Sequence, residues 1–156
     1  MSLTIGDKAP SFALKDKDGI IHALAKVKSP YVIVYFYPKD DTPGCTIEAQ
    51  TFTKDLARFE KSGVAIIGIS GGNEESKKKF CSKYGLKVLL LSDTDFSVAK
   101  KYGVYIKKSF MGRSFMGIAR TTFVLDKSHN IIKVFEKVDP KTHAPEILNF
   151  ISNIKR

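Results

Sequence analysis

Hydrophobic residues in this chain gather into short runs that alternate with segments of helical periodicity. Residues 31–36, 64–70 and 88–91 are almost continuously apolar, and the first two are rich in β-branched residues. Runs of this length are typical of strands that are buried on both faces of a sheet. Because helical segments lie between them, the pattern predicts an α/β fold with a central, largely parallel sheet flanked by helices.

Capping residues mark where the helices begin and end. The first helix is predicted to start after Thr42 as N-cap, with Pro43 at the first helical position, where a missing N–H costs nothing, and to stop at Gly63. Asn73 and Gly85 bracket a second helix. Further helices are predicted at residues 97–102 and 142–154.

Two hairpins are predicted outside these helical segments. One covers residues 11–22 with a turn at Gly19, and the other covers residues 121–135 with a turn at 126–130. Residues 104–119 show little periodicity, so we expect them to form a loop.

The composition is that of an ordinary globular protein with a basic surface. Of the 156 residues, 43% are hydrophobic and 27% charged, with no linker or repeat, so we expect one domain over residues 1–156. The formal net charge of +10 raises the question of a nucleic-acid partner. Only four of the 26 basic residues are arginines, whereas phosphate and base recognition favours guanidinium groups. We therefore expect a solvated basic surface, including the lysines of helical segment 74–79, and no nucleic-acid partner.

Targeting signals are absent from the pattern. The longest apolar run, residues 31–37, is far too short to span a membrane. The first residues lack the basic and apolar regions of a secretory signal. We therefore expect a cytoplasmic protein with no membrane partner.

The two cysteines, Cys45 and Cys81, do not indicate a disulfide scaffold, because the cytosol keeps thiols reduced. They do not form a C-x-x-C pair, and the three histidines show no ligand spacing, so we expect no metal site. The remaining interpretations are a packed residue or a catalytic thiol.

Cys45 stands near the start of the first predicted helix, just past the carboxyl end of a buried strand. Ligand chemistry in α/β sheets concentrates at that edge. A helix N-terminus offers partial positive charge and unpaired N–H groups, both of which stabilise a thiolate. The Thr42 hydroxyl is expected to cap the helix and to bind a substrate, and Pro38 to shield the thiol from water. The same residues also fit a simple strand-to-helix turn, and composition does not decide between the two.

The spacing of these residues resembles a known signature. The stretch PKDDTPGC resembles the P-x-x-x-T-x-x-C motif of peroxiredoxins, and YFYPKDDTPGCTIEA is especially similar to the Q-type group, also called bacterioferritin comigratory proteins. The resemblance extends from GDKAPSFAL near the start to ARTTFVLD near the end. It implies a thioredoxin-like fold with peroxiredoxin additions. The implied activity is reduction of hydrogen peroxide and organic hydroperoxides by a cysteine thiolate, without a cofactor.

The resemblance also implies roles for individual residues. Cys45 matches the peroxidatic cysteine, and Thr42 matches the hydroxyl that contacts thiolate and peroxide. Pro38 matches the shielding residue, and Arg120 the arginine that stabilises the thiolate and orients the peroxide. Without the resemblance, Arg120 could equally be a surface charge. Glu48 lies on nearly the same helix face as Cys45, as a partner for Arg120 or simply a favourable charge near a helix start.

The second cysteine bears on how an oxidised Cys45 is resolved. Many Q-type members carry a resolving cysteine five residues after the peroxidatic one, where this chain has Gln50. Cys81 matches the other position seen in the group, which implies a Cys45–Cys81 disulfide recycled by thioredoxin or a similar dithiol. The alternative is that Cys81 is a small buried residue and an external thiol resolves Cys45. Q-type relatives are often monomers, and a monomer is expected here.

A disulfide between two helices has a structural requirement. Its Cα atoms must lie within about 7 Å, so we expect the first turn of the Cys45 helix and part of the Cys81 helix to unfold on oxidation. Two other functions fit part of this pattern. A thiol-disulfide oxidoreductase requires C-x-x-C, which residues 45–48 lack. A non-catalytic basic binding module is the rival from a different class.

Overall fold

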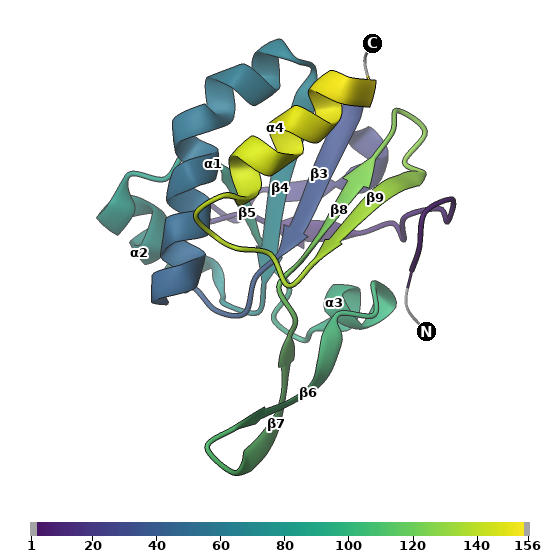
Figure 1. Ribbon diagram of the computed structural model, residues 1–156. Coiled ribbons are helices and arrows are strands. Elements are labelled where there is room, and N and C mark those ends of the chain that lie inside the picture. Colours follow the sequence, from purple (N-terminus) through teal and green to yellow (C-terminus); the bar gives the residue numbers. More distant parts are fainter. Residues whose placement is uncertain (1–2, 155–156) are drawn as a thin grey trace.

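The computed structural model describes residues 3–154, which form a seven-stranded sheet, helices on both of its faces and a separate two-stranded ribbon (Figure 1). The strand order in the sheet is β2-β1-β5-β4-β3-β8-β9. The strands of the sheet are β1 (Ala13–Lys15), β2 (Ile21–Ala23), β3 (Tyr31–Phe36), β4 (Val64–Ser70), β5 (Leu89–Ser92), β8 (Thr121–Leu125) and β9 (Ile131–Glu136). The ribbon consists of β6 (Tyr105–Phe110) and β7 (Arg113–Ile118).

All four predicted helices are present. They are α1 (Pro43–Lys61), α2 (Glu74–Tyr84), α3 (Ser97–Lys101) and α4 (His143–Ile154), and a short 3-10 helix, η1 (Leu24–Lys26), was not predicted. Around α2 the caps are as expected, because the Asn73 side chain accepts a hydrogen bond from the Ser76 amide and Gly85 is left-handed with φ of 62°. Among the described residues, no helix is both long and apolar enough to cross a membrane.

Parallel pairing is confined to the three central strands. Strands β3, β4 and β5 run parallel, whereas β1 pairs antiparallel with β2 and β5, and β8 pairs antiparallel with β3 and β9. The expectation of a largely parallel sheet is therefore wrong, and the sheet is mixed. The reason is that the two predicted hairpins add their strands to opposite edges of the parallel centre.

The sheet separates two hydrophobic cores. Alternate residues of β3 point to opposite faces: Ile33 and Tyr35 join the core under α1, α2 and α4, and Val32 and Val34 join the core under α3 and η1. All four side chains are at most 1% exposed. A strand buried on both faces is what the continuous apolar run predicted.

The expectation of a loop at residues 104–119 is wrong, because this segment forms the β6–β7 ribbon. Its two strands are joined at Met111 and Gly112, which both have positive φ, the turn geometry that suits hairpins. The ribbon does not join the seven-stranded sheet and extends away from it (Figure 1). Periodicity failed as a signal because most of the ribbon is exposed on both faces, so no apolar alternation is required.

Candidate active site

Cys45 lies in the first turn of α1, as the third residue of that helix. The chain leaves β3 at Phe36 and enters α1 at Pro43, with Thr42 in the N-cap position and an extended backbone. Cys45 is only 1% exposed. Because the first amides of a helix have no acceptor within the helix, the thiol lies where a negative charge is stabilised.

Arg120 reaches the same place from a distant part of the chain. It directly precedes β8, and the pairing of Thr121 with Phe36 sets it beside the end of β3. Its Nη2 donates to Cys45 Sγ at 3.3 Å, and its Nη1 donates to Glu48 Oε1 at 2.8 Å. The guanidinium group therefore bridges the thiol and the carboxylate.

Burial governs the electrostatics of this bridge. Burial raises the pKa of Glu48 to about 7, although the charge of Arg120 and its hydrogen bond act to lower it. The second Glu48 oxygen, Oε2, is buried and has no hydrogen-bond partner among the described residues. Burial acts to lower the pKa of Arg120, but attraction to Cys45 and Glu48 outweighs it, so the pKa is raised. Arg120 thus keeps its positive charge beside the thiol.

Gly44 makes room for the guanidinium group. A Cβ atom at this position would lie 3.0 Å from Arg120 Nη2 and 3.6 Å from Cγ of Pro140. A larger residue there would require the guanidinium group to shift by a few tenths of an ångström. Glycine at this position therefore favours the close approach of Arg120 to Cys45.

The expectation that the Thr42 hydroxyl caps α1 is wrong. Its Oγ1 donates to the carbonyl oxygen of Lys39 at 3.0 Å and makes no capping hydrogen bond. Because a hydroxyl oxygen has two lone pairs, Thr42 can still accept a hydrogen bond from a substrate. Pro38 is half-buried in the same turn, directly after the buried Tyr37.

Cys81 lies on α2, is 6% exposed, and forms no disulfide with Cys45. Both cysteines belong to the same hydrophobic core, which also contains Tyr35 and Phe80. Burial raises the pKa of the Cys81 thiol. Reduced Cys81 is thus a packed core residue on a helix separate from that of Cys45.

A buried ionic cluster joins the turn before Cys45 to α2. Lys77 was expected on a solvated helix face, but its side chain is fully buried, with Nζ 3.3 Å from Asp40 Oδ2 and 2.7 Å from Ser70 Oγ. The Tyr37 hydroxyl and Ser76 Oγ also donate to Asp40, at 2.6 and 2.7 Å. Burial lowers the pKa of Lys77 against the opposing effect of Asp40. This cluster could not be predicted from the sequence, because its lysine lies in a run of charged residues.

A second link joins the same turn to the far end of α2. Asp41 accepts a hydrogen bond from Lys83 at 3.1 Å and from the Tyr84 hydroxyl at 2.6 Å. Unlike the Asp40 cluster, this link is exposed to solvent. Two adjacent aspartates therefore hold the two ends of the helix that carries Cys81.

One basic residue of the ribbon, Lys108, is affected by the charges of the site. Burial and the charge of Arg120 lower the pKa of Lys108, whereas the charge of Cys45 acts to raise it. Lys108 therefore lies within electrostatic range of both groups. The sequence analysis missed it because its segment was expected to be a loop.

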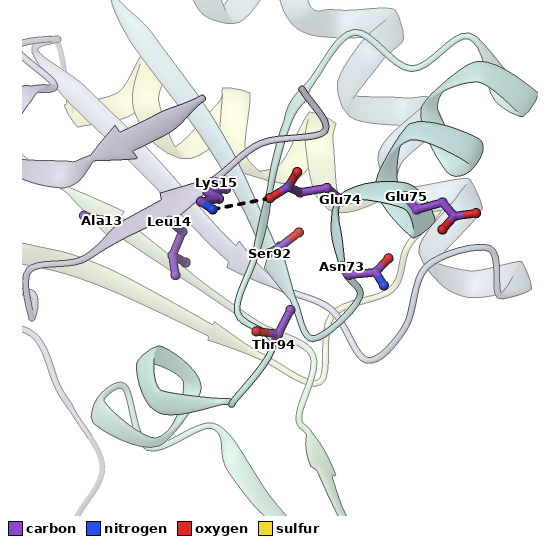
Figure 2. Close-up of a pocket in the computed structure, with 8 residues that line it drawn as sticks. All are labelled: Ala13, Leu14, Lys15, Asn73, Glu74, Glu75, Ser92 and Thr94. Atoms are coloured by element: carbon purple, nitrogen blue, oxygen red, sulfur yellow. Dashed lines mark ion pairs between the residues drawn. The ribbon is translucent and has the colours of Figure 1, made fainter. Parts of the chain in front are cut away.

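A pocket of about 560 Å³ lies elsewhere on the surface, away from the Cys45 site (Figure 2). Figure 2 shows the ion pair of Lys15 with Glu74, 3.8 Å apart, beside it. The lining residues are Ala13, Leu14, Lys15, Asn73, Glu74, Glu75, Ser92 and Thr94. Since none of the candidate site residues lines this pocket, it is not part of the Cys45 site.

Comparison with known proteins identifies the family. Residues 5–134 match the model of the AhpC/TSA family. Peroxiredoxin Bcp of Bacillus subtilis is 39% identical over 154 residues, which cover 99% of this chain and 98% of that protein.

Solved structures agree with the sequence comparison. The structure of a cysteine mutant of Xylella fastidiosa PrxQ matches with a TM-score of 0.93 and 29% identity, covering 100% of this chain and 99% of that one. A bacterioferritin comigratory protein of Xanthomonas campestris, studied for alkyl peroxide reduction, matches with a TM-score of 0.86 and 30% identity, covering 93% and 92%. The thioredoxin-like peroxiredoxin fold is thereby confirmed. The chain belongs to the AhpC/TSA family and is a peroxiredoxin of the Bcp or PrxQ group, and hence a peroxidase.

Proposed function

We propose that this peroxidase reduces hydrogen peroxide and organic hydroperoxides through the thiolate of Cys45. The observation that carries the proposal is the guanidinium of Arg120, whose two nitrogens lie 3.3 Å from Cys45 Sγ and 2.8 Å from Glu48 Oε1. With Glu48 holding one side, Arg120 presents fixed donors to sulfur and to a peroxide oxygen beside it. Glu48 and Gly44 act here as positioning residues.

In the proposed reaction, Cys45 sulfur attacks the terminal oxygen of the peroxide. The S–O bond forms, the O–O bond breaks, and the leaving oxygen takes a proton to become water or an alcohol. Sulfur is oxidised to the sulfenic acid as the peroxide is reduced. Negative charge moves from sulfur onto oxygen, so donors from Arg120 and Thr42 at that position stabilise the transition state more than the ground state.

Arg120 is the more exposed of the two groups in contact at the site. Cys45 is 1% exposed, whereas the Arg120 side chain is 18% exposed. Arg120 also borders a cavity of about 340 Å³. The apolar residues that line this cavity include Val104, Ile106, Phe123 and Val134. Neither Cys45 nor Thr42 lines this cavity, so Arg120 alone connects it to the thiol.

We further propose that Cys81 resolves the sulfenic acid. Its thiolate attacks Cys45 sulfur, an S–S bond forms, and the hydroxyl leaves as water; a dithiol such as thioredoxin then reduces the disulfide by exchange. The exposed Asp41 link is weaker than the buried link of Asp40 to Lys77. The helix end nearest Tyr84 is therefore the part of α2 expected to move.

Cysteine variants test these assignments. Cys45→Ser should abolish peroxide consumption, and Cys81→Ser should keep the first turnover but lose most dithiol-driven turnover. Mass mapping under non-reducing conditions after one equivalent of peroxide should find a peptide pair linked through both cysteines. Unchanged consumption by Cys45→Ser would remove Cys45 from the mechanism, and unlinked Cys81 would favour resolution by an external thiol.

A matched arginine pair tests the electrostatic role. Arg120→Lys keeps a charge but loses the two-pronged hydrogen bonding, so kcat/KM should fall roughly 100-fold. Arg58→Lys is the control, because the Arg58 side chain is 77% exposed and pairs with Asp55 at 3.9 Å, away from Cys45. Equal kinetics for the two variants would contradict the proposed role of Arg120.

The proposed setting is the reducing cytoplasm, with the chain acting as a monomer. Two unlinked cysteines support this setting, because thiols there stay reduced until peroxide arrives. Sedimentation equilibrium of the reduced and oxidised forms tests the oligomeric state, and turnover with thioredoxin against a small dithiol tests the reductant.

A further inference from the structure

The β6–β7 ribbon carries most of the exposed large hydrophobic side chains. Five of the nine such side chains among the described residues lie on it: Ile106, Phe110, Met111, Phe115 and Met116. The exposure is greatest at the tip, where Phe110 is 68% exposed and Met111 is 86% exposed. A concentration of apolar side chains on one projection marks an interaction surface rather than ordinary surface scatter.

The base of the ribbon is held firmly while its tip stands free. The Tyr105 ring stacks on Phe96 with centroids 4.5 Å apart, Ile118 is 1% exposed, and the Ala119 amide donates to the Val104 carbonyl at 2.8 Å. The rest of the ribbon extends away from the sheet (Figure 1). The tip is thus presented on an anchored support.

Charge indicates an anionic partner. Residues 105–118 contain three basic residues, Lys107, Lys108 and Arg113, and no acidic residue. The whole chain has a formal net charge of +10. Basic side chains beside exposed apolar ones are the combination that binds anionic lipid surfaces, because the apolar groups enter the interface while the charges meet the headgroups.

The arrangement of the side chains favours a lipid surface over a protein. Cross-strand partners share a face, and the pairs Phe110 with Arg113 and Lys108 with Phe115 lie on one face, whereas Lys107 with Met116 lies on the other. Apolar and basic side chains therefore occur on both faces. A protein partner would cover one face, but a fluid interface surrounds both.

We propose that the tip of the β6–β7 ribbon inserts into the headgroup region of an anionic bilayer. This contact needs no membrane-spanning segment, which was the basis on which a membrane partner was not expected. Arg120 follows the base of the ribbon, so under the proposed function the Cys45 site would face peroxides formed in lipid. Membrane binding itself is independent of the chemistry at Cys45.

A single tryptophan tests the insertion directly. The chain contains no tryptophan, so Met111→Trp places one reporter at the tip and Ile20→Trp, at a site 59% exposed in the wild type, places a control away from the ribbon. Both proteins are mixed, without peroxide, with phosphatidylcholine vesicles containing about one-third phosphatidylglycerol, and with pure phosphatidylcholine. The emission of Met111→Trp should shift to the blue with anionic vesicles only, and the shift should weaken in high salt.

Vesicle sedimentation tests the contribution of the apolar tip. The double variant Phe110→Ser/Met111→Ser should bind anionic vesicles at least about tenfold more weakly than wild type. Ile20→Ser/Ile21→Ser is the matched control, since it removes two side chains that are 59% and 62% exposed, and it should bind like wild type. Retained peroxide consumption in both variants confirms that the fold is intact.

Four outcomes would overturn the proposal. These are no shift with anionic vesicles, equal shifts for the two reporters, a shift that grows with protein concentration in the absence of lipid, and a shift caused by an acidic dithiol protein but not by vesicles. The third outcome would identify a second copy of the chain as the occupant, and the fourth a protein partner.

Discussion

At the residue scale, some buried polar groups in and around the site have hydrogen-bond partners, whereas others have none among the described residues. Arg120 satisfies one oxygen of Glu48, and the other oxygen is buried without a partner among the described residues. The Tyr35 hydroxyl is likewise buried without a partner among the described residues, whereas the Tyr37 hydroxyl donates a hydrogen bond to Asp40 at 2.6 Å. These differences lead to two predictions.

The first concerns the pH dependence of stability through Glu48. Burial raises its pKa from 4.5 to about 7, so between these values the folded protein holds a proton that the unfolded chain releases. The free energy of unfolding should therefore fall as pH rises through this window, by at most about 1.4 kcal/mol per pH unit. Glu48→Gln should remove this slope in urea titrations across the window.

A second titrating group makes the comparison between the two proteins necessary. Burial lowers the pKa of His143, so its contribution is lost as pH falls and has the opposite sign. His143 is present in both proteins, and subtracting their curves cancels it. Parallel curves for wild type and Glu48→Gln would show that Glu48 titrates alike in the folded and unfolded chains.

The second prediction compares two buried tyrosines. Tyr35→Phe removes a buried hydroxyl that has no hydrogen-bond partner in residues 3–154, but keeps the ring stacked on Phe52, with centroids 4.6 Å apart. The free energy of unfolding should rise by about 1 kcal/mol. Tyr37→Phe is the control and should lower it by about 1–3 kcal/mol, because it removes a charge-assisted hydrogen bond to Asp40. Equal losses for both variants in urea unfolding would refute the assignment.

At the element scale, α2 is fastened to the turn before Cys45 at two points of different strength. The buried link uses Lys77 and Asp40, and the exposed one uses Lys83, Tyr84 and Asp41. The proposed Cys45–Cys81 disulfide requires part of this helix to move. The exposed link is therefore the one that limits the movement.

Weakening the exposed link should speed disulfide formation. Asp41→Asn keeps a residue type that tolerates the left-handed backbone at this position, where φ is 59°, but removes the charge that holds Lys83. After one equivalent of peroxide, the linked Cys45–Cys81 peptide should appear a few-fold faster. Asp55→Asn serves as control, because it removes a carboxylate charge on α1 that pairs with Arg58 at 3.9 Å. A slower or unchanged rate in Asp41→Asn alone would show that the link does not limit resolution.

At the scale of the whole molecule, the two hydrophobic cores share the strands of the central sheet, β3 among them. Ile33 and Tyr35 pack in one core, and Val32 and Val34 pack in the other. Displacement of β3 would therefore disrupt both cores together. The shared strands give a physical reason for the single domain that the sequence predicts.

Urea unfolding should occur in one cooperative transition. Far-UV circular dichroism reports the helices, and tyrosine fluorescence reports the rings in both cores, including Tyr35 and Tyr102. The two curves should coincide. Separate midpoints would mean that the cores unfold independently and would contradict a single domain.

Local signals in the sequence determined the elements around the site. Three local features were predicted correctly: the apolar run of β3, the Thr42–Pro43 start of α1, and the Asn73 and Gly85 ends of α2. Strand burial and helix capping depend on neighbouring residues, so a local pattern indicates them. The spacing of Pro38, Thr42 and Cys45 also pointed to the family.

Only the tertiary structure decided which distant groups meet. Arg120 reaches Cys45, 75 residues before it in the chain, because β8 pairs with β3, and Lys77 is buried because α2 packs over Asp40. The exposed ribbon at 105–118 could not be predicted from apolar periodicity, because neither of its faces joins the core. Contacts and exposure of this kind depend on how the whole chain packs, and no local pattern encodes them.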